Sequence, residues 1–423
     1  MSRRVLMLLS QMPQDPSSGA ALSMLTMCEL LAARGFAVRI LGTTATEHAT
    51  PGDPYELLRG FGCDPTPLPV EHPTAGRADV LKFARRGVDT LLLDVGPTDR
   101  RSWETQYGEL FDRLLVREIE EYPPDILLTF GGSSVERERR RFVRSKGAAV
   151  VFALKNLSYF DRRAFHDVDA VMATSRFLSE KYRDAIGLES TPLLSPMQID
   201  DVVAEKEDPR FLTFINPTPA KGVLVFARIA EELSARHPDM PIMVVESRAA
   251  ADILVGAGMT GGVDLRARKN ILVSPGVAQP RHIYEVTRVL VVPSLWEEPQ
   301  GRVPCEAILN GIPPVVSDRG GLPEAAAAVD QEGAAIDPPG GFVLPIPEAI
   351  TPKATTLPDA DQVKAWIETC ETLMLHDGAW AEASLRAERN AWRFHPDRLG
   401  EQYAAFMQDV QRVPGETAGP GLD

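Results

Sequence analysis

Short apolar runs recur through this 423-residue chain, and most of them lead into a stretch with helical periodicity. The first run, residues 4–10, passes through a turn-rich loop into a helical pattern over 20–34, and a second run follows at 36–42. Residues 125–130 are almost continuously apolar, which is typical of a strand buried on both faces of a parallel sheet. Strands and helices that alternate in this way predict an α/β fold with doubly wound sheets.

An acidic segment at 200–208 interrupts the pattern, and a second series of strands starts after it. The chain is also too long for a single core of ordinary size. We therefore expect two Rossmann-like domains, the first over 1–200 and the second over 208–393. The strands expected in the second domain are 211–215, 242–245, 271–273, 289–292 and 314–317.

Two further regions have helical patterns. Residues 77–121 predict helices, and so do residues 360–411. The segment 414–423 is polar and rich in glycine and proline, so we expect a disordered tail there.

The composition limits the possible partners. With 45 basic and 59 acidic residues the net charge is -14, which argues against nucleic acid as a partner. The four cysteines are widely spaced and include no C-x-x-C pair, as is typical of reduced thiols. Since no apolar run approaches the length of a membrane span, we expect a cytoplasmic protein with at most peripheral membrane association. Nothing in the sequence indicates its oligomeric state.

A basic run at 137–146 is the exception to the acidic composition. A basic helical face can lie on an anionic membrane surface. The interleaved Glu136 and Glu138 favour an ordinary solvated face instead.

One segment, residues 289–311, combines a strand, a tight polar loop and a helix. Two carboxylates, Glu298 and Glu306, bracket a loop that contains Gly301. An α/β sheet presents ligands at the carboxyl ends of its strands, so this loop is a candidate binding site. The alternative is an ordinary crossover with two solvated glutamates.

The segment resembles glycosyltransferase family 4. The resemblance is carried by residues 293–307, which fit that family's E-x7-E pattern at Glu298 and Glu306, and it continues through 310–318 and the Gly-Gly-Leu-Pro-Glu at 320–324. It implies the GT-B fold, in which two doubly wound Rossmann-like domains face each other across a cleft. It also implies a last helix, about 396–413, that crosses back to the first domain.

The resemblance further implies which residues hold a nucleotide-sugar donor. Glu306 would accept both ribose hydroxyls, and Glu298 would contact the donor sugar. Glu297 competes for that second role, but the eight-residue step to Glu306 favours Glu298. The other implied donor contacts are Gly19, Ser274, Gly276, Gly301, Arg302 and Val303, of which Gly301 to Val303 would act through backbone amides at a helix start.

The cationic position is Lys221, which ends a loop similar to the family's phosphate-binding R-x4-K. It would neutralise the departing diphosphate. The chain departs from the family twice. Asn216 stands where Arg is usual, and Lys155 stands where many relatives have His near the reacting sugar. Arg302 could supply the charge that Asn216 lacks.

These residues predict a retaining glycosyltransferase that moves a hexose-type sugar from a nucleotide diphosphate donor, with a UDP-sugar as the first expectation. No cofactor and no metal are expected, since no D-x-D or His/Asp cluster marks a metal site. The acceptor, a small molecule, glycan or lipid, cannot be read from the loops at 48–76 and 93–105. We expect His48, His72 and Asp94 there to be surface residues.

Two alternatives remain open at this point. A catalytically silent relative would bind a nucleotide sugar without turnover, and Asn216 and Lys155 motivate that interpretation. A GT-B-fold sugar-nucleotide epimerase would convert the donor without any acceptor.

Overall fold

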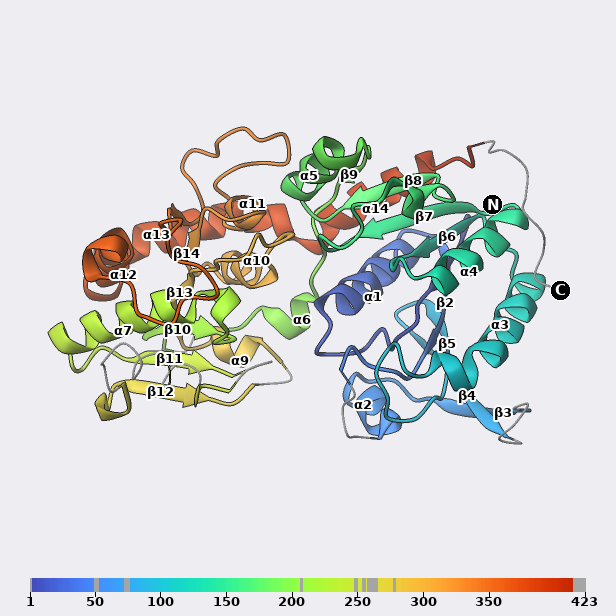
Figure 1. The fold of residues 1–423 in the computed structure, drawn as a ribbon, viewed down its shortest axis with the longest axis horizontal. Coiled ribbons are helices and arrows are strands. Elements are labelled where there is room, and N and C mark those ends of the chain that lie inside the picture. Colours follow the sequence, from blue (N-terminus) through green and yellow to red (C-terminus); the bar gives the residue numbers. More distant parts are fainter. Residues whose placement is uncertain are drawn as a thin grey trace. The chain divides into compact units, whose positions relative to one another are not determined.

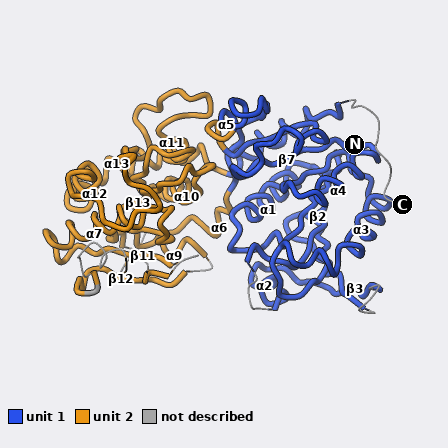
Figure 2. The backbone as a smooth tube through the Cα atoms, in the orientation of Figure 1, with its two compact units in different colours: residues 1–174, 179–196, 396–423 blue, residues 175–178, 197–395 orange. Residues whose placement is uncertain are grey.

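The computed structural model describes residues 2–48, 53–71, 77–205, 208–246, 250–252, 256, 265–276 and 279–413. The chain forms two compact units (Figure 2). The first unit comprises the residues up to Thr174, Ser179–Pro196 and the segment from Pro396 onward. The second comprises Ser175–Leu178 and Met197–His395. We expected the first domain to cover residues 1–200. The main part of the second unit instead begins at Met197, and Ser175–Leu178 also belong to that unit.

The first unit is built on a nine-stranded sheet in the described part of the chain, with the strand order β3-β4-β5-β2-β1-β6-β7-β8-β9 (Figure 1). All its pairings are parallel except β3 with β4 and β4 with β5. The strands are β1 (Arg4–Leu8), β2 (Ala37–Thr43), β3 (Thr66–Val70), β4 (Ala78–Arg85), β5 (Val88–Leu93), β6 (Ile126–Thr129), β7 (Ala149–Leu154), β8 (Ala170–Ala173) and β9 (Thr191–Pro192). The helices are α1 (Gly19–Ala32), α2 (Pro54–Gly60), α3 (Glu104–Glu121), α4 (Ser134–Ser145), α5 (Arg176–Ile186), whose first residues belong to the second unit, α14 (Pro396–Asp409) and the short η1 (Arg162–Phe165).

The prediction of helices throughout 77–121 is wrong for its first part. Strands β4 and β5 form an antiparallel hairpin there, and the helix α3 begins only at Glu104. The two residues between the strands, Arg86 and Gly87, both have positive φ, as the tight turns of twisted hairpins require. Val80 and Leu81 are buried on opposite faces of this hairpin, so the apolar residues do not mark a single helical stripe.

The second unit is built on a six-stranded sheet with the order β12-β11-β10-β13-β14-β15, in which every pairing is parallel. Its strands are β10 (Phe211–Ile215), β11 (Ile242–Val245), β12 (Ile271–Ser274), β13 (Thr287–Val292), β14 (Pro314–Ser317) and β15 (Phe342–Leu344). Its helices are α6 (Ile199–Val202), α7 (Val223–Arg236), α9 (Arg281–Tyr284), α10 (Arg302–Leu309), α11 (Leu322–Ala325), α12 (Lys364–Leu375), α13 (Asp377–Asn390) and the short η2 (Pro219–Lys221), η3 (Leu265–Ala267), η4 (Ala360–Val363) and η5 (Ala391–Phe394). The two mostly parallel sheets confirm the predicted α/β class.

The last helix, α14, packs against α1 within the first unit. The guanidinium of Arg3 donates to the carbonyls of Met407 (2.6 Å) and Val410 (2.8 Å) at the C-terminal end of α14, where a cation is favourable. The buried hydroxyl of Tyr403 donates to the carbonyl of Leu194 at 2.7 Å. These bonds tie the C-terminal segment to the first unit. The tail at 414–423 lies outside the described residues.

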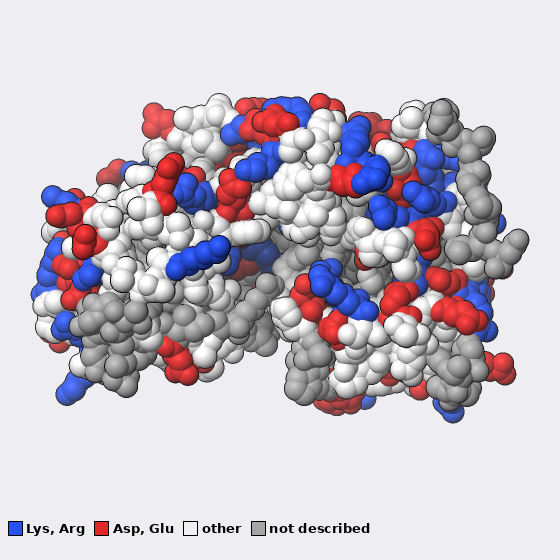
Figure 3. Space-filling view, viewed as in Figure 1, with Lys and Arg blue, Asp and Glu red and all other residues white. Residues whose placement is uncertain are grey.

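The basic run in α4 is solvated only in part, since Arg141 and Lys146 are exposed but other arginines are buried or paired. Arg139 and Arg140 are buried, and Arg140 forms an ion pair of 2.9 Å with Asp167. Arg144 pairs with Asp169 at 2.8 Å. Over the face in view in Figure 3, basic and acidic side chains are interspersed. No helix in the described part of the chain is long and apolar enough to cross a membrane.

Candidate functional site

The strand order of the second sheet places two loops side by side. From β10 the chain runs outward through β11 to β12, and then returns to the other side of β10 as β13. The loops that follow β10 and β13 therefore leave the sheet next to each other at its carboxyl edge. In open α/β sheets this reversal is where ligands bind. The predicted residues Asn216, Lys221 and Glu298 all lie in these two loops.

Backbone contacts interlock the two loops. The carbonyl of Ala220 accepts hydrogen bonds from the amides of Leu295 (2.9 Å) and Trp296 (3.2 Å). Gly222 has φ +83°, and a Cβ at that position would overlap the carbonyl oxygen of Pro293. Only glycine fits this close approach. The lysine before it is consequently held in a fixed relation to the loop after β13.

Lys221 and Glu298 form an ion pair across the interlocked loops. The ammonium of Lys221 donates to Oε1 of Glu298, and the hydroxyl of Ser294 lies 3.1 Å from the same oxygen. Glu298 is 7% exposed, whereas the Lys221 side chain is 33% exposed. The amide of Gly321 donates to the Glu298 carbonyl at 2.8 Å, which fixes its backbone. Of the two adjacent glutamates, Glu298 is buried and Glu297 is half-buried.

The helix α10 begins beside this ion pair. Its N-cap, Gly301, has φ +90°, and a Cβ there would lie 2.6 Å from the side chain of Leu322. Within the described residues no side chain caps the start of α10. The positive end of the helix dipole at Arg302 and Val303 is thus directed at the loop, where it favours an anion.

Glu306, one turn into α10, is buried and has two partners. Its Oε2 accepts a 2.7 Å hydrogen bond from the hydroxyl of Tyr284, which is also buried. Its Oε1 accepts from Nε (3.3 Å) and Nη2 (3.2 Å) of Arg302. Burial, followed by the charge of Glu306 and its hydrogen bond, raises the pKa of Tyr284 well above its ordinary value. Tyr284 therefore stays protonated and donates at any physiological pH.

Asn216 takes the first position after β10 in a strained conformation. Its φ is +63°, which asparagine tolerates better than other non-glycine residues. Its backbone N–H donates to the Val245 carbonyl at 2.9 Å. Its buried side-chain oxygen has no hydrogen-bond partner among the described residues. A buried acceptor without a partner calls for an explanation. At the carboxyl edge of the sheet, a hydroxyl of a bound ligand would supply the missing hydrogen bond.

Ser274 and Gly276 follow β12, the strand at one edge of the sheet. The carbonyl of Ser274 accepts from the amide of Glu246 at 2.9 Å, and Gly276 is exposed. They lie at the same carboxyl edge as the two interlocked loops, but β11 and β10 separate them from β13.

Lys155 and Gly19 belong to the first unit. Lys155 follows β7, and its ammonium donates to the hydroxyl of Ser195 at 3.2 Å. Gly19 is the first residue of α1, whose N-cap Ser18 accepts from the amide of Ala21 at 3.4 Å. Lys155 thus lies at the carboxyl end of a strand and Gly19 at the start of a helix, as the sequence predicts.

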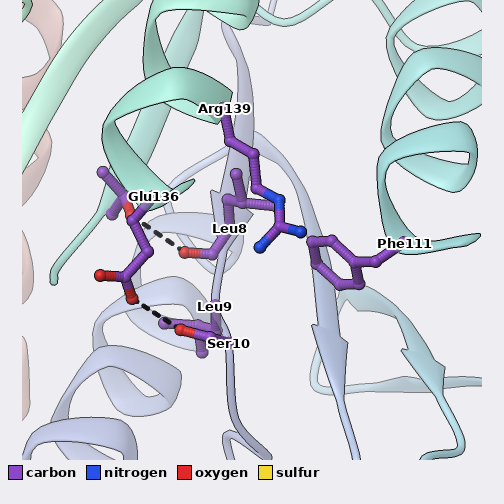
Figure 4. A pocket seen from close by; sticks show the side chains of 7 residues that line it. Leu8, Leu9, Ser10, Phe111, Glu136 and Arg139 are labelled. Carbon is purple, nitrogen blue, oxygen red and sulfur yellow. Dashed lines mark hydrogen bonds between the residues drawn. The ribbon is translucent and has the colours of Figure 1, made fainter. Parts of the chain in front are cut away.

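The first sheet has its own reversal, between β1 and β6, which sequence reasoning passed over. Oε1 of Glu136 accepts from the hydroxyl of Ser10 at 2.6 Å, and Oε2 accepts from the amide of Ser133 in a capping box at the start of α4. Ser10 and Glu136 line a cavity of about 10 Å³ (Figure 4), which has room for a single water. The S-x-x-E pattern at 133–136 was the available signal.

Of the three surface residues expected in the first-domain loops, His48 is exposed. Asp94 is half-buried and shapes its own loop, since its Oδ1 accepts from Thr44 (3.1 Å) and from the amide of Gly96 (3.0 Å). His72 lies outside the described residues. Among the residues that the structure describes, no group of three or more His, Cys, Asp or Glu side chains could hold a metal ion.

Sequence reasoning also missed the partners of the two site glutamates. No sequence pattern marks Ser294 as a partner of Glu298 or Tyr284 as a partner of Glu306, because an aromatic residue in an apolar stretch usually indicates core packing. The polar tip of a buried tyrosine normally finds a partner. That expectation was the one signal that could have singled out Tyr284.

Comparison with known proteins adds to this geometry. The family model described as glycosyl transferases group 1 matches residues 263–340, which include the interlocked loop after β13, α10 and the Gly-Gly pair. No curated protein sequence matches the chain.

Solved structures are similar over nearly the whole chain. The catalytic domain of starch synthase IV from Arabidopsis thaliana, bound to ADP and acarbose, has a TM-score of 0.65 at 12% identity and covers 96% of this chain and 100% of its own. HepE from Anabaena, in complex with UDP and glucose, has a TM-score of 0.61 at 15% identity, with 96% and 100% covered. A UDP-forming α,α-trehalose-phosphate synthase from Burkholderia xenovorans has a TM-score of 0.60 at 13% identity, with 97% and 99% covered. These similarities confirm the predicted GT-B fold.

Proposed function

We propose that this protein is a retaining glycosyltransferase that moves a hexose-type sugar from a nucleotide diphosphate sugar to an acceptor hydroxyl. A UDP-sugar is the donor we expect first. The observation that carries the proposal is the convergence of Lys221, Glu298 and Glu306 around the start of α10, whose N-cap is Gly301, at the reversal of the second sheet. The family match over 263–340 and the nucleotides bound in similar structures support it.

Each group of the site has a chemical role in this proposal. Glu306 accepts hydrogen bonds from the ribose hydroxyls. The start of α10 and Lys221 receive the diphosphate, with Arg302 supplying charge that Asn216 does not carry. Glu298, which pairs with Lys221, contacts hydroxyls of the donor sugar. Ser274 and Gly276 offer backbone groups to the base.

The proposed reaction needs no enzyme nucleophile. The bond between the anomeric carbon and the diphosphate oxygen breaks, and the acceptor oxygen bonds to the same face of the sugar. An oxygen of the departing diphosphate takes the acceptor's proton. Lys221 stabilises the negative charge as it develops, so that catalysis consists of positioning and electrostatics. We propose that neither a metal nor a cofactor takes part.

The test is incubation with UDP-, GDP- and ADP-sugars and a panel of acceptors, with detection of the released nucleoside diphosphate. NMR of the product then gives its anomeric configuration, which should match that of the donor. Inversion would contradict the retaining mechanism.

Two other outcomes correspond to other functions. Binding without turnover across varied acceptors would identify a catalytically silent relative, an outcome that the uncharged Asn216 in the phosphate loop makes worth testing. Conversion of the donor sugar without any acceptor would identify an epimerase.

A further inference from the structure

Glu306 has one fixed partner and one loose partner. The hydroxyl of Tyr284 approaches Oε2 at 2.7 Å from a side chain that is 1% exposed. The guanidinium of Arg302 approaches Oε1 at 3.2 and 3.3 Å from a side chain that is 25% exposed. The shorter bond is therefore the one shielded from water, and the longer ones come from a side chain with room to move.

The chain also fixes the backbone around Tyr284. Tyr284 ends the short helix α9, just before β13. The hydroxyl of Thr287 at the start of β13 donates to the carbonyl of Ile283 at 2.7 Å, and it lies 2.9 Å from the hydroxyl of Thr213 on the central strand β10. Both threonines are fully buried. The backbone next to Tyr284 is thus held by the central strands of the sheet rather than by a surface loop.

A count of acceptor sites shows why this asymmetry matters. An ionised carboxylate offers about four lone-pair sites. Tyr284 and the two Arg302 nitrogens use three of them. A vicinal ribose diol brings two hydroxyl donors, so at least one present partner has to give way. The partner with the longer bonds and the more exposed side chain is Arg302.

From these contacts we infer that Tyr284 is a positioning residue, which sets the Glu306 carboxylate so that it selects ribonucleotides, and that the ribose diol displaces Arg302. The inference rests on the proposed function, because it specifies how the same site recognises its donor. When Arg302 is displaced, its guanidinium is freed beside the start of α10, where the diphosphate is expected. Binding of the ribose to Glu306 would thereby release the positive charge of Arg302 for the diphosphate.

The test measures a ratio within each protein. Calorimetry gives the Kd of UDP, GDP and ADP and of their 2′-deoxy forms. The base whose ribonucleotide binds most tightly to the wild type is then used for all variants. We expect the wild type to prefer the ribonucleotide by about tenfold or more, the scale of one hydrogen bond to a charged group. Tyr284→Phe should reduce this preference to about threefold or less. Because both ligands are measured on the same sample, a smaller folded fraction does not change the ratio.

Tyr403→Phe is the matched control. Tyr403 is equally buried and donates a 2.7 Å bond, but to the carbonyl of Leu194 in the first unit. It should keep the full wild-type preference. Arg302→Ala removes the loose partner and should also keep the preference, even if both nucleotides bind more weakly. Because the Arg302 side chain is only half-buried, this substitution keeps the inference testable if Tyr284→Phe does not fold.

The outcomes separate the inference from the proposed function. Undiminished ribose preference in Tyr284→Phe, or its loss in Arg302→Ala, would overturn the inference and leave the proposed function standing. A folded wild type that binds none of the three nucleoside diphosphates would overturn both.

Discussion

The two sheets of this protein reverse their strand order in the same way but place different chemistry at the reversal. In the second unit, Lys221, Glu298 and Glu306 converge there and the loops interlock through Ala220. In the first unit, Ser10 and Glu136 meet around a cavity of about 10 Å³, and the carboxylate is used to cap α4 (Figure 4). The common architecture therefore does not determine chemistry, which depends on the side chains in the two loops at each reversal.

The largest effect is expected where the loops of the second unit interlock. Gly222→Ala places a Cβ on the Pro293 carbonyl at φ +83° and should lower the free energy of unfolding by about 3 kcal/mol or more. Gly35→Ala is the control, since Gly35 has φ +85° with nothing within 4 Å of the added Cβ. It should cost about 1–2 kcal/mol. Denaturant unfolding compares the two variants, and equal costs would show that the loops can separate freely.

The second-largest effect is expected on turnover, when the Lys221 cation at the strand-order reversal of the second sheet is removed. Lys221→Ala should reduce kcat by about 100-fold, because the departing diphosphate loses its compensating charge. Donor binding should fall less. Steady-state kinetics with the donor found in the screen separates kcat from KM. A loss confined to KM would show that Lys221 acts in binding alone.

Removal of the buried carboxylate should weaken binding. Glu306→Ala should cost about 1.5–3 kcal/mol in the binding of the nucleoside diphosphate, the scale of hydrogen bonds to a charged group. Calorimetry measures the change. Unaltered affinity would mean that Glu306 serves only to hold Tyr284 and Arg302 in place.

The first reversal should respond only in stability. Ser133→Ala removes the N-cap of α4 and should cost about 1 kcal/mol of unfolding free energy while leaving nucleotide binding unchanged. Unfolding and calorimetry on one preparation check both parts. A loss of nucleotide affinity here comparable to that of Glu306→Ala would remove the proposed difference between the two reversals.

Local sequence patterns predicted many of the parallel strands because these are nearly continuous apolar runs, such as β6 and β7. The β4–β5 hairpin was assigned wrongly, because the turn at Arg86 and Gly87 was not recognised and the apolar residues were assigned to a helix. The ion pairs of Arg140 and Arg144 in α4 were missed for a different reason. Their acidic partners, such as Asp167 and Asp169, lie more than twenty residues further along the chain, so a local charge count cannot show that they are paired.

The site could be predicted only in part. Spacing and family resemblance pointed to Lys221, Glu298 and Glu306, but not to the ion pair between the first two. That pair exists because β10 and β13 are neighbours, and strand order is a property of the whole sheet rather than of either segment. The same reason hid Tyr284, whose hydroxyl meets Glu306 from a different helix.

The central claim is that the second reversal binds a nucleotide sugar, and a thermal-shift screen of the wild-type chain tests it most directly. A ligand that binds only the folded state raises its stability by about 2.7 kcal/mol at 100 times its Kd. We predict that at least one of the UDP-, GDP- and ADP-sugars raises the Tm in a concentration-dependent way, with a UDP-sugar expected to be the strongest. A folded protein whose Tm is unchanged by all of them would contradict the claim.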